Sequence, residues 1–173
     1  MLVALLVAAL RSGQVHLGRM IGLTLLGIVT AAEAVSTSVL IGNLLTAPQR
    51  MSDVPHAAAL ALLRDAALIW ILNVLTFSLW YWEIDGGGPS RRHGVGYHSE
   101  DFVFPQASLE PRSSKLWFPH YVDYLFLAFT ASTAFSPTDT LVLSVRAKLL
   151  MMIQSLISLV VLAIMAARAI NTL

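Results

Sequence analysis

Residues 121–167 read YVDYLFLAFTASTAFSPTDTLVLSVRAKLLMMIQSLISLVVLAIMAA, and the fold class can be inferred from them. Their second part, residues 149–167, is a run of 19 residues without a charge. A helix needs about 20 mostly apolar residues to cross the hydrocarbon core of a bilayer. Basic residues flank the run at Arg146, Lys148 and Arg168. We therefore expect a membrane-spanning helix at 145–171.

The first part of this stretch predicts a shorter helix that does not cross. Residues 121–135 are apolar but number only 15, and Ser and Thr become frequent toward their end. The segment SPTD follows at 136–139, and its Pro137 prevents a regular helix from continuing. Irregular backbone at membrane depth occurs only where protein buries it or where it lines a wet cavity. We predict a re-entrant half-helix and a polar turn before the last span.

Three apolar runs lie upstream, and two of them are long enough to span. These are residues 20–45 and residues 57–82. The second run ends in WYW at 80–82, and clustered aromatic residues of this kind mark a membrane–water interface. Residues 1–10 are also apolar, but they reach only about half the length of a span. They form a stub or one half of a fourth span.

The composition supports the same class of protein. Of the 173 residues, 57% are hydrophobic and 12% are charged, whereas about 25% of the residues of a typical soluble domain are charged. The net charge of +1 gives no field for binding nucleic acid, and the absence of cysteine excludes thiolate chemistry. The sequence predicts an all-α, multi-pass protein of the cell membrane, with three to four transmembrane helices plus the re-entrant half-helix. Membrane lipids are its expected partners, and nucleic acid is not.

Asp123–Arg168 resembles the pore-loop and inner-helix half of two-transmembrane potassium channels. That family runs an aromatic pore helix, a Thr-x-Thr-Thr-x-Gly-Tyr-Gly-Asp filter, a short polar stretch, a basic residue and an inner helix. The corresponding string here is FTASTAFSPTD at 129–139, and Arg146 and Lys148 precede the last helix. The resemblance implies a channel-like protein, a homo-oligomer (a tetramer in that family) and conduction of monovalent cations.

This resemblance divides the chain into two parts. Residues 1–56 hold the stub and the first full transmembrane helix. Residues 57–173 form a channel-pore-like module, with an outer helix at 57–82, a polar loop at 83–120, a pore-like helix at 121–135, a filter-like turn at 136–139 and an inner helix at 145–171.

A second resemblance covers most of the chain. The segments WYWEIDGGGP at 80–89 and TAFSPTD at 133–139 resemble those of a group of uncharacterised bacterial, often actinobacterial, membrane proteins. This likeness implies no established activity.

The filter-like turn departs from the potassium-channel pattern at its glycines. Phe135 and Pro137 stand where the family has glycine. A left-handed backbone costs a non-glycine residue roughly 1–2 kcal/mol, and proline cannot adopt a positive φ. The standard potassium filter is therefore not available to this sequence.

Two interpretations of the turn remain open. In the first, hydroxyl groups line a hydrated path, and Asp139 forms an acidic ring that favours cations. In the second, the pore-module scaffold is kept by a non-conducting structural or interaction protein, Ser and Thr pack helices, and Asp139 caps a turn. The residues of this candidate pore are Thr130, Thr133, Ala134, Phe135, Ser136, Pro137, Thr138 and Asp139.

Glu33 is the only charged residue of the first span and needs a partner inside the membrane. If the first two spans form an antiparallel hairpin, Arg64 lies within reach of it across the turn. We predict an intramembrane ion pair between Glu33 and Arg64, with a structural role or a role in ion relay.

The polar loop offers metal-ligand side chains, namely His93, His98, Glu100, Asp101, His120 and Asp123. They lack helical i, i+4 spacing, and the chain contains no G-x-S-x-G, P-loop or H-E-x-x-H motif. We predict no metal site, no cofactor and no enzymatic activity. A membrane enzyme or metal binder that uses loop 83–120 is the third hypothesis.

Overall fold

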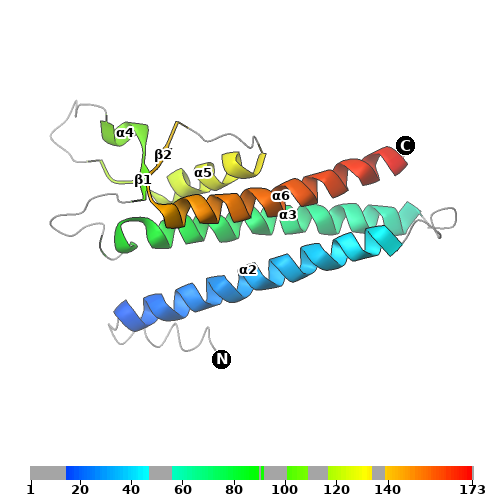
Figure 1. Ribbon diagram of the computed structural model, residues 1–173, viewed down its shortest axis with the longest axis horizontal. Helices are drawn as coiled ribbons and strands as arrows, with labels where there is room; N and C mark the ends of the chain where they lie inside the picture. The colour runs from blue at the N-terminus through cyan, green and yellow to red at the C-terminus, as the bar shows by residue number, and fades with distance from the viewer. Residues whose placement is uncertain are drawn as a thin grey trace.

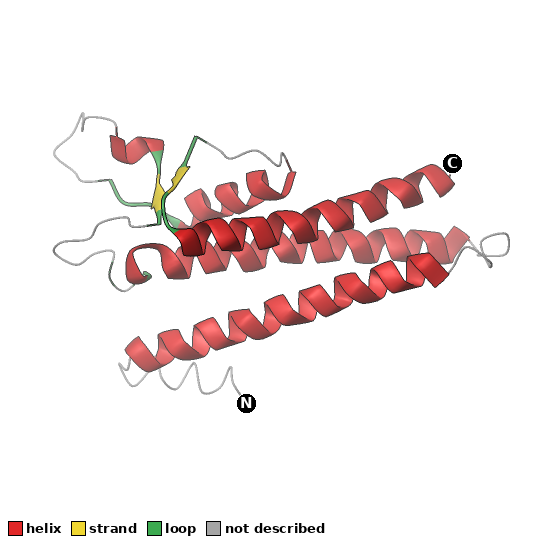
Figure 2. Ribbon diagram, in the orientation of Figure 1, coloured by secondary structure: helices red, strands yellow, loops and turns green. Residues whose placement is uncertain are grey.

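The computed structural model of the chain describes residues 15–46, 56–89, 91, 101–108, 117–133 and 139–172. Its longer helices are α2 (Val15–Thr46), α3 (His56–Ile84), α5 (Tyr121–Thr133) and α6 (Val145–Thr172). The shorter elements are the 3₁₀ helix η2 (Asp85–Gly87), β1 (Phe102–Val103), α4 (Pro105–Ser108) and β2 (Leu141–Val142). Figure 2 shows that helices make up nearly all of the described chain. The stub at 1–10 lies outside the described residues.

Three helices are long and apolar enough to cross a membrane. The candidate spans are His16–Gly42, Leu63–Gly87 and Val145–Ala167, with mean hydropathies of 1.7, 1.4 and 2.5. The last of these has 23 residues, which at about 1.5 Å per residue exceeds the roughly 30 Å of a hydrocarbon core. Large apolar side chains are exposed along all three helices, among them Val39, Leu72 and Leu156. The prediction of a mostly helical protein is confirmed, and three of its described helices could cross a membrane, as a multi-pass membrane protein requires.

Helix α3 is central to the bundle. It packs against α2, α5 and α6 (Figure 1). Toward its C-terminal end lies an aromatic core that includes Phe77, Tyr81, Phe102 and Tyr124, and a smaller core around Val161 packs nearer its N-terminal end. Beyond Ile84, the consecutive glycines of the Gly86–Gly88 segment have φ values of 57°, 87° and 91°. Glycine adopts such values without a Cβ penalty, and the segment ends the helix.

Helix α5 enters the bundle from the end at which α6 also begins. At its start, the Tyr121 hydroxyl lies 2.8 Å from Ser78 Oγ, near the C-terminal end of α3. Its 13 residues give a length of about 20 Å, and its last turn reaches Asn73 through Ser132. At β2 the chain is again beside β1, because Val142 pairs with Phe102. Helix α5 therefore runs into the bundle beside α3. The described chain resumes at β2, at the end of the bundle where α5 starts (Figure 1).

Two buried aspartates hold this arrangement together, and we call them with their partners Tyr124, Ser144 and Arg146 the carboxylate clasp. Asp101 binds Arg146 through two contacts, Nε to Oδ1 at 2.7 Å and Nη2 to Oδ2 at 2.6 Å, and also accepts from the Ser144 hydroxyl. Asp85 accepts from the Tyr124 hydroxyl and, at 3.3 Å, from the backbone N–H of Asp101. Both side chains are fully buried. The clasp thus joins the end of α3, β1, the first turn of α5 and the first turn of α6.

The helix bounds lie close to those expected from the sequence, with two differences. Helix α2 begins at Val15, five residues before the predicted start at 20, and its added turn includes Arg19, whose Nη2 donates to the carbonyl of Glu83 at 3.1 Å. The polar loop contains β1 and α4, and its Asp101 is buried rather than solvated. The Asp101 side chain is therefore part of the core.

The clasp predicts a large loss of stability on Asp101→Ala. This change leaves Arg146 and Ser144 without their buried acceptor, and breaking a buried pair typically costs about 3–5 kcal/mol. Because the Arg146 side chain is 54% exposed, we expect about 2–3 kcal/mol after allowing for solvent screening. Thermal unfolding in detergent measures the effect. The matched control is Asp65→Ala, which removes an exposed pair with Arg64 and should cost at most about 1 kcal/mol. Equal losses in both variants would contradict the clasp.

Candidate functional site

Polar side chains from four helices lie in the interior of the bundle. In a membrane such groups must find partners inside the protein, since an unpaired polar group in hydrocarbon costs several kcal/mol. They are nearly or fully buried, with exposed fractions of at most 6%, and comprise Glu33, Thr37, Asn73, Thr76, Ser132, Gln154 and Ser158. This group of buried polar residues is the strongest candidate for a functional site among the described residues.

Three of these interior residues form, together with the buried Tyr81, a hydrogen-bonded series with one direction, which we call the polar chain: Tyr81, Gln154, Ser132 and Asn73. The Tyr81 hydroxyl donates to Gln154 Oε1. Gln154 Nε2 donates to Ser132 Oγ at 2.7 Å, and Ser132 Oγ donates to Asn73 Oδ1 at 3.3 Å. Each donor leads to the next residue, so the chain joins α3, α6 and α5 and returns to α3.

Backbone contacts fix the last turn of α5 beside α6. Gln154 Nε2 also donates to the carbonyl of Ala128 at 2.8 Å, and Ser158 Oγ donates to the carbonyl of Ser132 at 2.7 Å. The second of these carbonyls belongs to the C-terminal turn of α5, where the helix itself supplies no donor. Helix α6 therefore caps the C-terminal end of α5.

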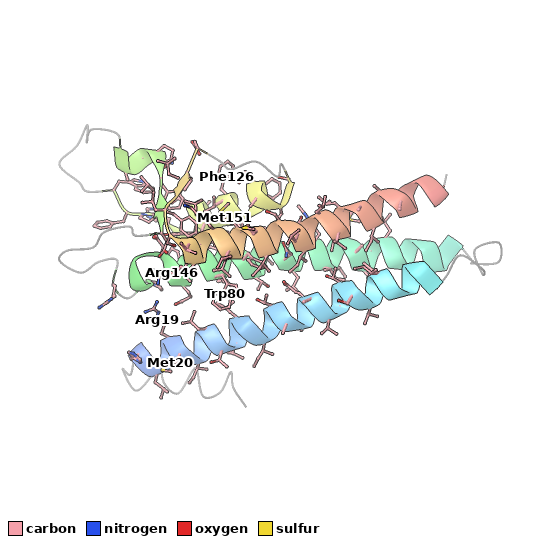
Figure 3. All side chains as sticks on the ribbon, viewed as in Figure 1. Arg19, Met20, Trp80, Phe126, Arg146 and Met151 are labelled. Atoms are coloured by element: carbon pink, nitrogen blue, oxygen red, sulfur yellow. The ribbon has the colours of Figure 1, made fainter. Side chains whose placement is uncertain are left out.

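Glu33 lies between α2 and α3 next to the polar chain. Its Oε1 accepts a hydrogen bond of 2.7 Å from the Thr76 hydroxyl. One turn nearer the clasp, Trp80 Nε1 donates to Thr30 Oγ1 at 2.9 Å, and Figure 3 shows Trp80 between the two helices. These two contacts set the register of α2 against α3.

The predicted ion pair between Glu33 and Arg64 is wrong. Arg64 lies 3.0 Å from Asp65 on an exposed surface, with 71% of its side chain accessible. Residue 76, the partner of Glu33, is 12 residues beyond residue 64, or roughly 18 Å along the helix axis. The prediction assumed that both helices start level at the turn, whereas packing near Trp80 shifts their register.

The candidate pore residues fall into three groups. Thr130 and Thr133 both lie on α5, and their hydroxyls donate to the carbonyls of Phe126 and Phe129 at 2.9 Å. Asp139 is exposed directly before β2. The remaining members lie outside the described residues, namely Ala134, Phe135, Ser136, Pro137 and Thr138. The structure thus places the two sides of the turn and not the turn itself.

The metal-ligand side chains of the polar loop are used in the fold where the structure describes them. Asp101 belongs to the clasp, and Asp123 Oδ2 accepts from the backbone N–H of His120 at 2.7 Å, which caps the start of α5. Among the described residues, no three His, Cys, Asp or Glu side chains lie together as metal ligands would. His93, His98 and Glu100 lie outside the described residues.

Sequence reasoning missed the polar chain and the clasp. Tyr81 was expected at the membrane–water interface with its aromatic neighbours, but it is fully buried and bound to Gln154. The available signal was the presence of polar residues inside apolar runs, such as Asn73 and Gln154. Their partners lie on other helices and could not be read from spacing along one helix.

Comparison of the chain with protein-family models, with curated proteins and with solved structures finds no match.

The polar chain predicts that Gln154→Met destabilises the protein although the two side chains are similar in size. The change removes three hydrogen bonds, to Tyr81, Ser132 and Ala128. Bonds between membrane helices average about 0.6 kcal/mol each, so we expect a loss of roughly 2 kcal/mol in the free energy of unfolding, measured by detergent titration. Ile153→Met, on the exposed face of the same helix, is the control and should be near neutral. If Gln154→Met left the free energy of unfolding unchanged, the stabilising role of the polar chain would be contradicted.

Proposed function

We propose that the protein is a channel-like, multi-pass protein of the plasma membrane that conducts monovalent cations and is not an enzyme. In this proposal α5 is a re-entrant half-helix, 136–139 is the pore turn and α6 is the inner helix. The observation that carries the proposal is the course of the chain. Helix α5 runs into the bundle beside α3 and ends at Thr133, level with the polar chain. At Val142, before α6 starts, the polypeptide again lies beside β1.

Electrostatics at the inner end of α5 favour a cation. The C-terminal end of a helix carries a partial negative charge of about half an electron. Because α5 stops partway through the bundle, this charge lies inside the proposed membrane region. Asp139 adds an exposed carboxylate where the chain resumes. Together with the hydroxyls of residues 130, 133, 136 and 138, these groups suit a hydrated path for cations without the glycine-based potassium filter.

Assembly into a homo-oligomer, a tetramer by analogy with the channel module, would surround such a path with copies of α5 and α6. Helix α5 presents an apolar outer face that supports this arrangement. Val122, Phe126 and Phe129 are 47–67% exposed, and with Leu125 they line a hollow of about 320 Å³. In the proposed assembly a neighbouring copy covers this face, and lipids cover the outward faces of α2 and α3.

A second candidate function is supported by the polar chain. The polar chain joins three helices by hydrogen bonds within one subunit and makes a rigid scaffold. A non-conducting structural or interaction protein would keep this scaffold and lack the flux. The two candidates therefore differ in one measurable property.

Flux in liposomes distinguishes them. The purified protein, reconstituted with a potassium or sodium gradient, should pass monovalent cations, and Asp139→Asn should lower the rate several-fold because the carboxylate no longer attracts cations. The control is Asp65→Asn, which removes an exposed carboxylate near the opposite end of α3 and should leave the rate unchanged. Absence of flux in every salt, from an oligomer shown to be folded, would contradict the channel proposal and favour the scaffold.

A further inference from the structure

Glu33 and its neighbours hold buried polar atoms that the polar chain does not use. Among the described residues, Glu33 Oε2, Thr37 Oγ1 and Asn73 Nδ2 are buried and have no hydrogen-bond partner. Their side chains are 1%, 6% and 0% exposed. Three such atoms in one region point to a ligand, since buried polar groups are nearly always paired.

These atoms belong to facing turns of α2 and α3. Thr37 is one turn from Glu33 on α2, and Asn73 is one turn from Thr76 on α3, so each pair shares a helix face. Glu33 contacts Thr76, and the antiparallel register given by Thr30 and Trp80 therefore places Asn73 opposite Thr37. This register puts the four side chains, which we call the cluster, along the same two turns of the α2–α3 interface.

The direction of the polar chain selects the ligand. Ser132 accepts from Gln154 and so directs its own proton to Asn73 Oδ1, which leaves the Asn73 amide N–H₂ as the group that faces the cluster. A ligand here must accept from this amide and also donate to the carboxylate of Glu33. A bare metal cation does neither, whereas water does both, and a buried water typically has about three polar partners.

We propose that Glu33, Thr37 and Asn73 bind a water molecule through which Glu33 takes up and releases a proton. This inference concerns a site away from the α5–α6 turn and does not depend on cation flux. On uptake, a hydronium ion gives its proton to Glu33 Oε2, an O–H bond forms there, and neutral water stays bound. Release is the reverse transfer.

The cluster provides hydrogen bonds for both protonation states. With Glu33 ionised, the water donates to Oε2 and to Thr37, and it accepts from Asn73. With Glu33 protonated, the water accepts from Oε2–H and from Asn73, and it donates to Thr37. Since Thr76 donates to the other carboxylate oxygen, both oxygens of Glu33 have a hydrogen-bond partner in either state.

In the part of the chain that the structure describes, no charged side chain competes with Glu33 at its depth. Residues 66–82 on α3 and 149–167 on α6, the two helices that pack against α2, contain no charged residue. Tyr81 is the titratable residue of these segments, and its hydroxyl is bound to Gln154. The charged groups lie toward the helix ends: Arg19 and Glu83, Arg146 and Lys148, and Arg64 and Asp65.

Infrared difference spectroscopy of the full chain in lipid, between low and high pH, tests the proposal. We expect a carboxylic C=O band that appears at low pH, responds to exchange into D₂O and is lost in Glu33→Gln. Asp65→Asn should retain it. A band that persists in folded Glu33→Gln, or that responds to sodium concentration at constant pH, would overturn the proposal.

Two further variants keep the test decisive if Glu33→Gln does not fold. Thr37→Val removes a partner of the water and should shift the band to higher frequency, because the acid then forms a weaker hydrogen bond. Thr24→Val is the control, since that hydroxyl is exposed and donates within its own helix, and it should leave the band unchanged. A band that is indifferent to Thr37→Val, or is absent from the wild-type protein, would also overturn the proposal.

Discussion

The pairing of Asp101 with Arg146 is the interaction on which the remaining structure depends. It fixes the first turn of α6 to β1, while Asp85 fixes Tyr124 in the first turn of α5. Both helices consequently start at one end of the bundle (Figure 3 shows Arg146 there). A charge-assisted, two-contact bond is directional as well as strong, so it sets position as well as stability.

The depth reached by α5 follows from this anchoring. A helix of 13 residues that starts at the clasp ends level with Asn73 and Gln154, and Ser132 then bridges them. Inside a membrane the free carbonyls of its last turn need partners, and Ser158 from α6 donates to one of them, the carbonyl of Ser132. Helix α5 and the polar chain are thus connected by direct contacts.

Much of the helical framework could be predicted from composition and apolar run length. The bounds of α3 and α6 lie within two residues of the predicted ones, because long apolar runs determine them. The partner of Glu33 could not be predicted, since the register of α2 against α3 depends on the packing of Trp80 on Thr30. Nor could the burial of Asp85 and Asp101, whose main partners are 16 to 45 residues away in sequence. For the candidate pore, the helices before and after the turn could be predicted from the sequence. The geometry of residues 134–138 stays a prediction.

The re-entrant course of α5 is tested most directly by finding the side of the membrane on which residues before α5 and after the turn lie. The chain contains no cysteine, so single-cysteine variants can be labelled without background. We expect His120→Cys and Leu141→Cys, both at exposed positions, to react with a membrane-impermeant thiol reagent from the same side. Arg64→Cys should react from the opposite side. Reaction of residues 120 and 141 from opposite sides would mean that the chain crosses the membrane between them, and it would contradict the re-entrant half-helix.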